Sequence, residues 1–403
     1  MFLLKRIGCR LLQTAFRIAL PLLPYREPTI LPSCDALDSV LRQEKSASVL
    51  IVTGSASIRH GLVAPVETAL NKAGIPYAVY HNTQPNPTVS NVEEGLALYH
   101  RHHCDTLIAL GGGSAMDCAK GIGARVAYPK RPLNKLGGVM RVLRKLPPLI
   151  AIPTTAGTGS EVTLAAVITD SDTHRKYAIM SFPLIPRYAV LDATLSYSMP
   201  PHLTAATGMD ALTHAVEAYI GRSTTKKTRA LALNATKLVF ENVERAYADR
   251  HDHLARTNML KAAYEAGVAF SVSYVGYIHA IAHSIGGEYG TPHGLANAVI
   301  MPYVLEAYGK STHKKLHALG VAAGVCTESD SHETGAKRFI EAIKALNATM
   351  QIPSSIEDVK AADIPALAKR AEQEANPLYP VPKLMTRKEL ERLYYEIAGE
   401  RLS

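Results

Sequence analysis

Three histidines in one short segment are the residues of this sequence best suited to chemistry. His279, His283 and His293 lie within residues 276–302, among alanine, isoleucine and glycine. A single histidine in such surroundings is usually a hydrogen-bonded core residue. Several imidazoles together can share a metal ion, because each neutral ring offers one nitrogen lone pair. The segment therefore predicts a metal site.

An aspartate and a fourth histidine upstream can complete such a site. Apolar residues recur at helical spacing through residues 207–219 without a proline, which predicts a helix. Asp210 and His214 are four residues apart, so they project from one face of that helix. They could also form an ordinary surface pair, but this leaves the second histidine-rich segment unexplained. By spacing alone, the downstream ligands would be His279 and His283, one helical turn apart.

Short β-branched runs alternate with helical patterns from about residue 47 onward. The runs cover residues 49–53, 78–80 and 106–110, and the helical patterns cover residues 63–72, 92–102 and 115–123. This rhythm predicts an α/β fold with a parallel sheet covered on both faces, which binds ligands at the carboxyl ends of its strands. A further β-rich passage spans residues 167–191. Beyond residue 203 the patterns are helical, with turns expected at Gly221, Pro292, Pro302 and Pro353.

These patterns predict three parts of the chain. Residues 1–30 are a basic, apolar N-terminal segment, residues 31–200 an α/β domain, and residues 201–403 an all-helical domain. The candidate metal ligands belong to the helical part. We expect the active site in the cleft between the two large domains, where ligand sites commonly form.

Two turns in the α/β part are suited to binding phosphate. Residues 111–114, Gly-Gly-Gly-Ser, follow a predicted strand and open a predicted helix. Glycines there let backbone N–H groups approach an anion at the helix N-terminus, although a simple tight turn is the alternative. Met116 stands where a G-x-G-x-x-G fingerprint has its last glycine. A second loop after a predicted strand near residue 150 adds the hydroxyl groups of Thr154, Thr155, Thr158 and Ser160.

The bulk composition is that of an ordinary globular protein. The chain has 403 residues, 47% of them hydrophobic and 20% charged, which is enough for two domains with full cores. Tryptophan is absent and aromatic residues make up 6%, so the diffuse net charge of +9 does not point to a nucleic-acid partner. The five cysteines show no CxxC spacing, which favours a reducing compartment and a cytoplasmic location.

The first 26 residues are unusual because they contain five basic residues and no acidic residue. Arg10 and Arg17 interrupt the apolar stretch, which argues against a secretory signal. A helix packed on the protein is the first interpretation. A basic amphipathic helix in peripheral contact with an anionic membrane is the second. An organelle transit peptide is the third, and the scarcity of serine weakens it.

Five motifs resemble those of the iron-containing, or group III metal-dependent, alcohol dehydrogenases. They are PNPT (85–88), GGGSAMDCAK (111–120), PTTAGTGSEVT (153–163), GMDALTHAVEAY (208–219) and HAIAHSIGGEYGTPHG (279–294). The resemblance runs in the family's order from about residue 47 to residue 305. It implies a Rossmann-like N-terminal dinucleotide-binding domain, an all-α C-terminal domain, a dehydroquinate synthase-like fold overall, and a homodimer.

The resemblance also implies a ligand set that differs from the one suggested by spacing. The family's metal ligands correspond to Asp210, His214, His279 and His293. His283 then corresponds to a catalytic histidine near the nicotinamide and the substrate, for proton relay or substrate orientation. The metal implied is Fe2+, with Zn2+ as the alternative, because three imidazoles and one carboxylate suit both. The reaction implied is hydride transfer between a primary alcohol, or the aldehyde, and NAD or NADP.

For the dinucleotide, the resemblance implies a second set of residues. The pyrophosphate is expected over the glycine-rich turn, with the threonine-rich loop beside it. Further residues expected to contact the cofactor lie elsewhere in the sequence. The residues are Gly54, Asn86, Gly112, Gly113, Ser114, Asp117, Thr154, Thr155, Thr158 and Lys176.

One departure from the family pattern concerns the choice of dinucleotide. Many NAD-preferring members have an aspartate at the end of the second-strand motif, and Gly54 occupies that position here. Without a carboxylate there is no like-charge penalty against a 2′-phosphate, and Ser55 and Ser57 could bind one. We therefore predict that NADP is accepted, with NAD as the alternative.

Three other functions remain open. A metal-dependent cyclase like dehydroquinate synthase shares the fold but uses a glutamate and two histidines. A hydroxyacid or diol dehydrogenase of the same family would use the same site on another alcohol. A non-catalytic metal-binding or membrane-associated protein is suggested by the basic N-terminus.

Overall fold

The computed structural model describes residues 2–170 and 175–399. The chain folds into two compact units. One is Pro24–Met199, and the other combines Met1–Leu23 with Pro200–Ser403. The predicted division assigns dinucleotide binding to one domain and metal binding to the other. Two compact units do not test what each unit binds, so this assignment stays a prediction.

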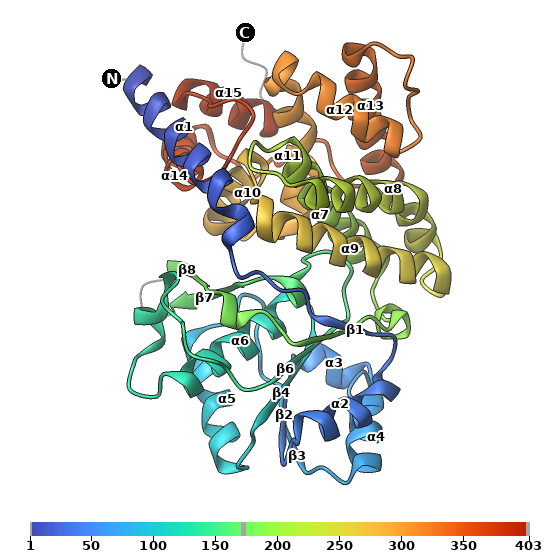
Figure 1. The fold of residues 1–403 in the computed structure, drawn as a ribbon. Helices are drawn as coiled ribbons and strands as arrows, with labels where there is room; N and C mark the ends of the chain where they lie inside the picture. Colours follow the sequence, from blue (N-terminus) through green and yellow to red (C-terminus); the bar gives the residue numbers. More distant parts are fainter. Residues whose placement is uncertain (1, 171–174, 400–403) are drawn as a thin grey trace. The chain divides into compact units, whose positions relative to one another are not determined.

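A six-stranded parallel sheet forms the centre of the Pro24–Met199 unit (Figure 1). Its buried strands are short and rich in valine, isoleucine and leucine, as expected for a sheet covered on both faces. In spatial order the strands are β1 (Thr29–Leu31), β9 (Tyr188–Val190), β6 (Leu149–Pro153), β4 (Thr106–Gly111), β2 (Val49–Val52) and β3 (Tyr77–Tyr80).

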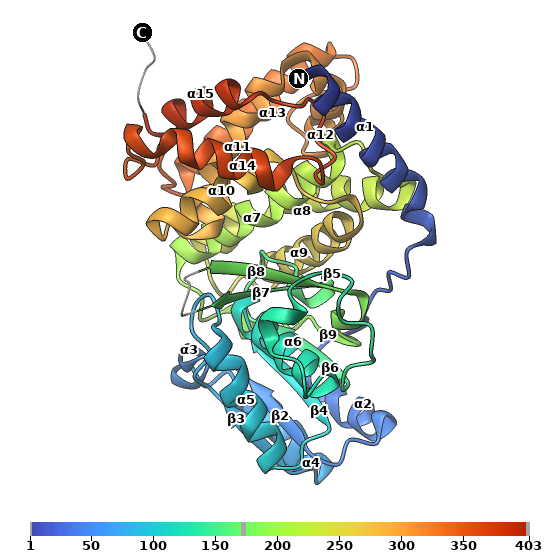
Figure 2. The same cartoon turned by 90° about the vertical axis from the view of Figure 1, so that its left-hand side faces the viewer.

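Alternate residues of each strand face opposite layers of helices. Leu50 and Val52 of β2 belong to a core with α5 (Val89–Arg101) and α6 (Gly113–Ala127). Val49 and Ile51 of the same strand belong to a second core with α2 (Leu37–Glu44) and α4 (Ala64–Ala73). The predicted parallel sheet with two covered faces is therefore confirmed, and Figure 2 shows its strands with α5 and α6 in front.

A smaller sheet lies beside α6, and a buried lysine fixes the chain that leads into it. The strands are β5 (Gly138–Val139), β8 (Arg175–Met180) and β7 (Ala165–Asp170). Lys120 Nζ on α6 donates to the backbone oxygens of Ser160, Thr163 and Ala165 at 2.8–3.0 Å. Burial lowers the pKa of this lysine to about 8, against the opposing effect of nearby carboxylates. The threonine-rich loop after β6 is thereby held against α6.

The second unit is helical and is organised around α7 (Pro201–Ile220). Residues 208–218 of α7 are all buried, and α8 (Lys226–Ala248), α9 (His253–Ser273) and α11 (His293–Tyr308) pack against it. The other α-helices that follow residue 200 are α10 (Tyr277–Tyr289), α12 (His313–Ala322), α13 (His332–Thr349), α14 (Ile364–Ala375) and α15 (Arg387–Ile397). Polar residues on α7 therefore lie inside the unit and need partners there.

The turn predicted at Pro302 is wrong, because Pro302 lies inside α11. A proline in a helix leaves the carbonyl four residues earlier without its usual N–H donor. Here that carbonyl belongs to Ala298, and the side-chain amide of Asn347 on α13 donates to it at 2.8 Å. The helix continues because a residue 49 positions away replaces the missing bond. The breaks expected at Gly221 and Pro292 are confirmed, since these residues flank α7 and α11.

The N-terminal segment forms α1 (Phe2–Ala19), which belongs to the helical unit. Among the described residues no single helix is long and apolar enough to span a bilayer. Only α9 and α10 taken together reach that threshold, and a bend of 101° separates them.

Candidate metal and dinucleotide sites

Helix α7 carries three acidic or imidazole side chains on one stripe. Asp210, His214 and Glu217 are spaced four and three residues apart, so they project from the same side of the helix. All three are buried, with at most 5% of the residue surface exposed. Buried polar groups at this spacing must be satisfied by the elements that face them.

The N-terminus of α10 meets this stripe at Glu217. The carboxylate accepts the backbone N–H groups of Gly276 and Ile278, each at 2.8 Å, so it caps α10 from another helix. It also lies 2.6 Å from Nδ1 of His279, the third residue of α10. A side chain at Gly276 would not fit, because its Cβ would be 2.7 Å from Glu217 Oε1. This contact fixes where His279 points.

Helix α11 brings the last histidine to the same place. His293 is its first residue, and Gly294 follows directly. A Cβ on Gly294 would lie only 2.4 Å from the backbone oxygen of Ala206, so the start of α11 can lie this close to α7 only with glycine there. The glycine therefore sets the separation between His293 and Asp210, whose Oδ1 lies 3.5 Å from His293 Nε2.

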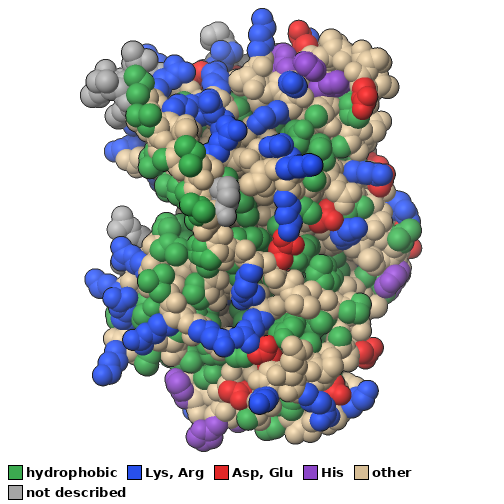
Figure 3. Space-filling model, viewed as in Figure 1, with side chains coloured by type: hydrophobic (Ala, Val, Ile, Leu, Met, Phe, Trp, Pro, Cys, Tyr) green, Lys and Arg blue, Asp and Glu red, His purple; other side chains and the backbone are tan. Residues whose placement is uncertain are grey.

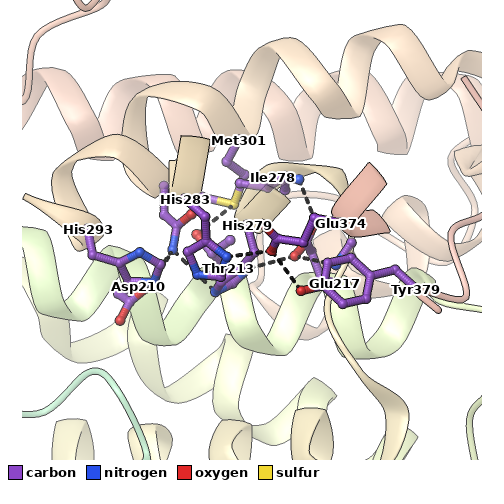
Figure 4. A network of polar contacts seen from close by, with 12 residues as sticks. Asp210, Thr213, Glu217, Ile278, His279, His283, His293, Met301, Glu374 and Tyr379 are labelled. Atoms are coloured by element: carbon purple, nitrogen blue, oxygen red, sulfur yellow. Dashed lines mark hydrogen bonds and ion pairs between the residues drawn. The ribbon is translucent and has the colours of Figure 1, made fainter. Parts of the chain in front are cut away.

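The structure brings together the four ligands implied by the family resemblance. Asp210, His214, His279 and His293 each offer one ligand atom, and these atoms all lie within 4.8 Å of one another. Figure 4 shows three of these residues, Asp210, His279 and His293, within a network of polar contacts. The side chain of His293 is 40% exposed, whereas the other three residues are buried, so the group opens to its surroundings on the His293 side.

The donor set fits a divalent cation. Burial lowers the pKa of His279 well below its usual value, and the neighbouring histidines reinforce this shift, so the ring is held in the neutral form that binds metal. Because Nδ1 of His279 is engaged by Glu217, Nε2 is left facing the group, an arrangement common for metal-binding histidines. A carboxylate with three imidazoles suits Fe2+ and Zn2+ alike.

Asn297 lies against this group and was not foreseen from the sequence. Its amide nitrogen donates to Asp210 Oδ1 at 2.7 Å and lies 3.1 Å from His293 Nε2 and 3.3 Å from His279 Nε2. The signal was present, since Asn297 is one turn after His293 on α11 and is fully buried. Its contacts show that three of the ligand atoms converge on one point.

His283 lies beside the group rather than within it. It is one turn after His279 on α10, and its ring stacks on that of His293 with 5.1 Å between centroids. Its Nδ1 lies 2.6 Å from Glu374 Oε1 on α14, and the same oxygen accepts the hydroxyl of Tyr379 at 2.8 Å. Its side chain is 44% exposed. Glu374 is 91 residues away from His283, and no local pattern in the sequence links the two.

In the other unit, the two predicted phosphate loops lie side by side. Gly112 is the N-cap of α6, so the backbone N–H groups of Gly113 and Ser114 begin that helix. A Cβ on Gly112 would be 3.1 Å from Thr155 Oγ1, and one on Gly113 would be 3.2 Å from Thr158 Cγ2. Thr154 continues the contact, because its N–H donates to the oxygen of Gly111. The glycine turn and the threonine loop thus form one small surface at the strand ends.

The remaining predicted dinucleotide residues fall into three places. Lys176 Nζ donates to Asn86 Oδ1 at 2.9 Å, and the N–H of Asn86 donates to Ser114 Oγ, so both adjoin the glycine turn. The half-buried Asp117 accepts from Ser160 Oγ and from the N–H of Val167, so its two oxygens bind the protein itself. Gly54 follows β2 and is the N-cap of α3 (Ser55–Arg59), at the end of a neighbouring strand.

Comparison with known families now decides the class. A model described as iron-containing alcohol dehydrogenase matches residues 32–193, and one described as the C-terminal part of the Fe-containing alcohol dehydrogenase family matches residues 204–398. The chain belongs to the iron-containing alcohol dehydrogenases. The predicted family membership is confirmed.

Individual relatives of this iron-containing alcohol dehydrogenase match over most of their length. 1,3-Propanediol dehydrogenase of Citrobacter freundii is 38% identical over 352 residues, which covers 87% of this chain and 90% of that protein. Lactaldehyde reductase of Escherichia coli (strain K12) is 38% identical over 339 residues, covering 83% and 88%. NAD-dependent methanol dehydrogenase of Bacillus methanolicus is 38% identical over 333 residues, covering 82% and 87%.

Solved structures agree with the sequence relatives. A crystal structure of 1,3-propanediol oxidoreductase superposes with a TM-score of 0.89 at 34% identity, covering 93% of this chain and 99% of that chain. The predicted fold class and enzyme class are confirmed. This iron-containing alcohol dehydrogenase is a metal-dependent, NAD-linked oxidoreductase that interconverts alcohols and aldehydes.

Proposed function

We propose that the enzyme interconverts a short-chain diol and the corresponding hydroxyaldehyde at a primary carbon. Asp210, His214, His279 and His293 hold Fe2+, with Zn2+ as the alternative metal. The observation that carries the proposal is the convergence of four ligand atoms within 4.8 Å. The substrate class is supported by the names of two relatives, 1,3-propanediol dehydrogenase and lactaldehyde reductase.

When bound, the cation supplies a Lewis acid for the alcohol or aldehyde oxygen, and the dinucleotide accepts or supplies the hydride. The chain's own residues position and deprotonate the substrate. The side chains of His293, in the ligand group, and of His283, beside it, are 40% and 44% exposed, so the substrate approaches on their side. Glu217 keeps Nε2 of His279 facing the group, and the buried Asp210 offers the negative charge.

His283 moves the hydroxyl proton in this proposal. Glu374 accepts the hydrogen on Nδ1 of His283, which leaves Nε2 as the basic atom. Nε2 takes the proton when the alcohol is oxidised and returns it when the aldehyde is reduced. Tyr379 holds the carboxylate of Glu374 through its hydroxyl.

The dinucleotide pyrophosphate binds at the start of α6. Backbone N–H groups of Gly113 and Ser114 and the hydroxyl groups of Thr155 and Thr158 supply the donors, and the helix N-terminus favours the negative charge. Lys176 and Asn86 lie next to this turn and offer a cation and an amide. Asp117 acts indirectly, because its carboxylate holds Ser160 and β7 in place.

NADP is accepted together with NAD. Beside Gly54, a cavity of about 410 Å3 is lined by Ser55, His81 and Asn82, which offer hydrogen-bond donors to a 2′-phosphate. Glu94 also lines this cavity and opposes a phosphate there. We therefore expect kcat/KM for NADPH and NADH to differ by no more than about tenfold, or ~1.4 kcal/mol. A strong preference for NADH would contradict the proposal.

The decisive experiment combines metal content and turnover in the same variants. His214→Ala and His293→Ala should each lose bound iron and the oxidation of NADPH and NADH with lactaldehyde or 3-hydroxypropanal. His202→Ala is the matched control, because His202 lies on α7 but is exposed, and it should keep both. Normal iron content and turnover in His214→Ala or His293→Ala would overturn the assignment.

We also propose a cytoplasmic homodimer. The family resemblance supports the dimer, and five free cysteines, four of them buried, support a reducing compartment. Light scattering on the purified full chain tests the dimer, and a monomer at micromolar concentration would contradict it. Cell fractionation at high salt, which releases peripheral proteins from membranes, tests the location against a cytosolic marker.

A further inference from the structure

Helix α1 is fastened to the helical unit by its polar side. The guanidinium of Arg10 donates to the backbone oxygens of Val381 and Pro382 at 2.7 and 3.0 Å. The amide of Gln13 donates to the oxygens of Pro377 and Tyr379 at 3.2 and 2.8 Å. Phe16 adds an edge-to-face contact with Tyr274. In Figures 1 and 2, α1 lies along the outside of the helical unit.

The opposite side of α1 is apolar and exposed. Ile7, Leu11 and Ile18 are 49%, 66% and 72% exposed, and Leu22, just beyond the helix, is 84% exposed. The spacings of four and seven residues place Ile7, Leu11 and Ile18 in one row on α1, and Leu22 follows in the short 3-10 helix Leu20–Leu22. An amphipathic helix normally turns its apolar side to the protein, and α1 does the reverse. We therefore expect a partner from outside the described residues to cover this apolar row.

Positive charge lies next to this row, on the side of α1 that carries Arg10 and Gln13. Arg6 and Arg17 lie on α1 itself, and no acidic residue occurs in the first 26 positions. Arg10 and Arg222 lie close enough for their charges to repel, and burial together with Arg229, Arg222 and Arg17 lowers the pKa of Lys315 to about 8. Figure 3 shows lysine and arginine side chains gathered over the part of the molecule where α1 lies.

Three occupants differ in how they would meet this surface. A second copy related by a two-fold axis would place the same basic cluster against itself. A nucleic acid would pair with the charges but would leave the aliphatic row without a partner. A bilayer with anionic headgroups satisfies both features, because the acyl boundary accepts the row while the headgroups attract the cations.

We propose that α1 docks this enzyme on an anionic lipid surface, with Ile7, Leu11, Ile18 and Leu22 inserted at the acyl boundary and the exposed arginines beside them on the headgroups. This role is separate from catalysis, since none of these residues belongs to the metal or dinucleotide sites. The helix stays attached to the protein through Arg10 and Gln13 while its apolar row enters the interface.

Vesicle flotation of the full-length enzyme tests the proposal. Vesicles of phosphatidylcholine alone are compared with vesicles of phosphatidylcholine and phosphatidylglycerol in equal parts. We expect binding to the anionic vesicles only, and weaker binding as salt is raised. Leu11→Glu/Ile18→Glu should reduce partitioning at least about tenfold. Arg17→Glu/Arg222→Glu should reduce it at least about tenfold as well, since each cation contributes about fivefold.

Controls separate docking from folding and from other partners. Leu254→Glu replaces a residue of α9 that is 58% exposed but lies outside α1, and it should bind vesicles like the parent enzyme. All variants should keep NADH oxidation with aldehyde, because the changed side chains point to solvent. Equal partitioning of Leu11→Glu/Ile18→Glu and the parent would overturn the proposal. So would equal binding to both vesicles, conversion of a dimer to a monomer by Leu11→Glu/Ile18→Glu, or duplex DNA binding without vesicle binding.

Discussion

At the scale of single residues, Glu217 is the main residue that positions a ligand of the proposed metal site. It is not itself one of the four ligands. It receives three donors from residues 276–279, and all of them are buried. Two of these bonds start α10 and the third orients His279. One side chain therefore sets both the position and the rotation of a proposed ligand.

Glu217→Gln should weaken metal binding about 10–100-fold. Whichever way the new amide is placed, its NH2 group faces an N–H donor from Gly276, Ile278 or His279, so at least one bond is lost. Iron titration of the apoprotein measures the effect, and circular dichroism shows that the fold persists. Glu241→Gln, on the exposed side of α8, is the control and should bind iron normally. Unchanged affinity in Glu217→Gln would show that this carboxylate only caps α10.

Glu374 should matter for turnover but not for metal content. Glu374→Ala frees His283 to rotate, and we expect kcat to fall about 10–100-fold because an acid–base group is no longer oriented. Glu374→Gln can still accept from His283 and Tyr379 through one oxygen, so it should recover part of that loss. Steady-state kinetics at saturating aldehyde and an iron assay are the measurements. A loss of iron in parallel with kcat would place Glu374 in the metal site instead.

At the scale of elements, the site depends on three helices whose separations are set by small residues. Residues 208–218 of α7 are buried throughout, Gly276 admits the carboxylate of Glu217, and Gly294 admits the oxygen of Ala206. Between α9 and α10 the chain turns at Tyr274, which has φ of +64°, an unusual conformation for a side chain of this size. The ligand of α11 is thus positioned by close backbone approach, and the ligand of α10 by the side chain of Glu217, which Gly276 admits.

Helix α11 offers a test of how this region is stabilised. Asn347→Leu removes the donor to Ala298 O, the carbonyl that Pro302 leaves unpaired, and should cost about 1–3 kcal/mol of unfolding free energy. In a Pro302→Ala background the helix supplies its own N–H to that carbonyl, so the same change should cost less. Urea unfolding of the two single variants and the double variant measures the coupling. Additive effects would mean that Asn347 does not compensate for the proline.

At the scale of the whole molecule, the two proposed ligands of the enzyme should stabilise different parts of the chain. The metal ligands all lie between residues 210 and 293, and the dinucleotide residues all lie between residues 54 and 176. Hydrogen exchange should show Fe2+ or Zn2+ protecting α7, α10 and the start of α11, and chelation reversing it. NADH should protect residues 111–114 and 154–158. Saturating ligand at about 100 times Kd is worth about 2.7 kcal/mol. Metal-induced protection confined to the sheet would contradict the ligand assignment.

The sequence predicted the sheet and the helical half because both rest on local periodicity. It also found Asp210 and His214, which share a helix face, but spacing alone selected His283 over His293. His293 joins the group only because α11 starts against α7, and local pattern does not encode that approach. Glu217, Asn297 and Glu374 were missed for a related reason. Their roles depend on partners brought by other elements, 61, 87 and 91 residues away in chain numbering.

The reactivity of the buried amine of Lys120 should report how often the threonine-rich loop opens. Lys120 has no exposed surface, and its nitrogen donates hydrogen bonds to oxygens of residues 160–165. An amine-reactive reagent can therefore reach it only after those bonds break. The rate at which Lys120 is acylated under native conditions would therefore measure how often the segment beside the start of α6 opens. A dinucleotide bound at the start of α6 should lower the rate of Lys120 acylation. A substrate without phosphate should leave that rate unchanged.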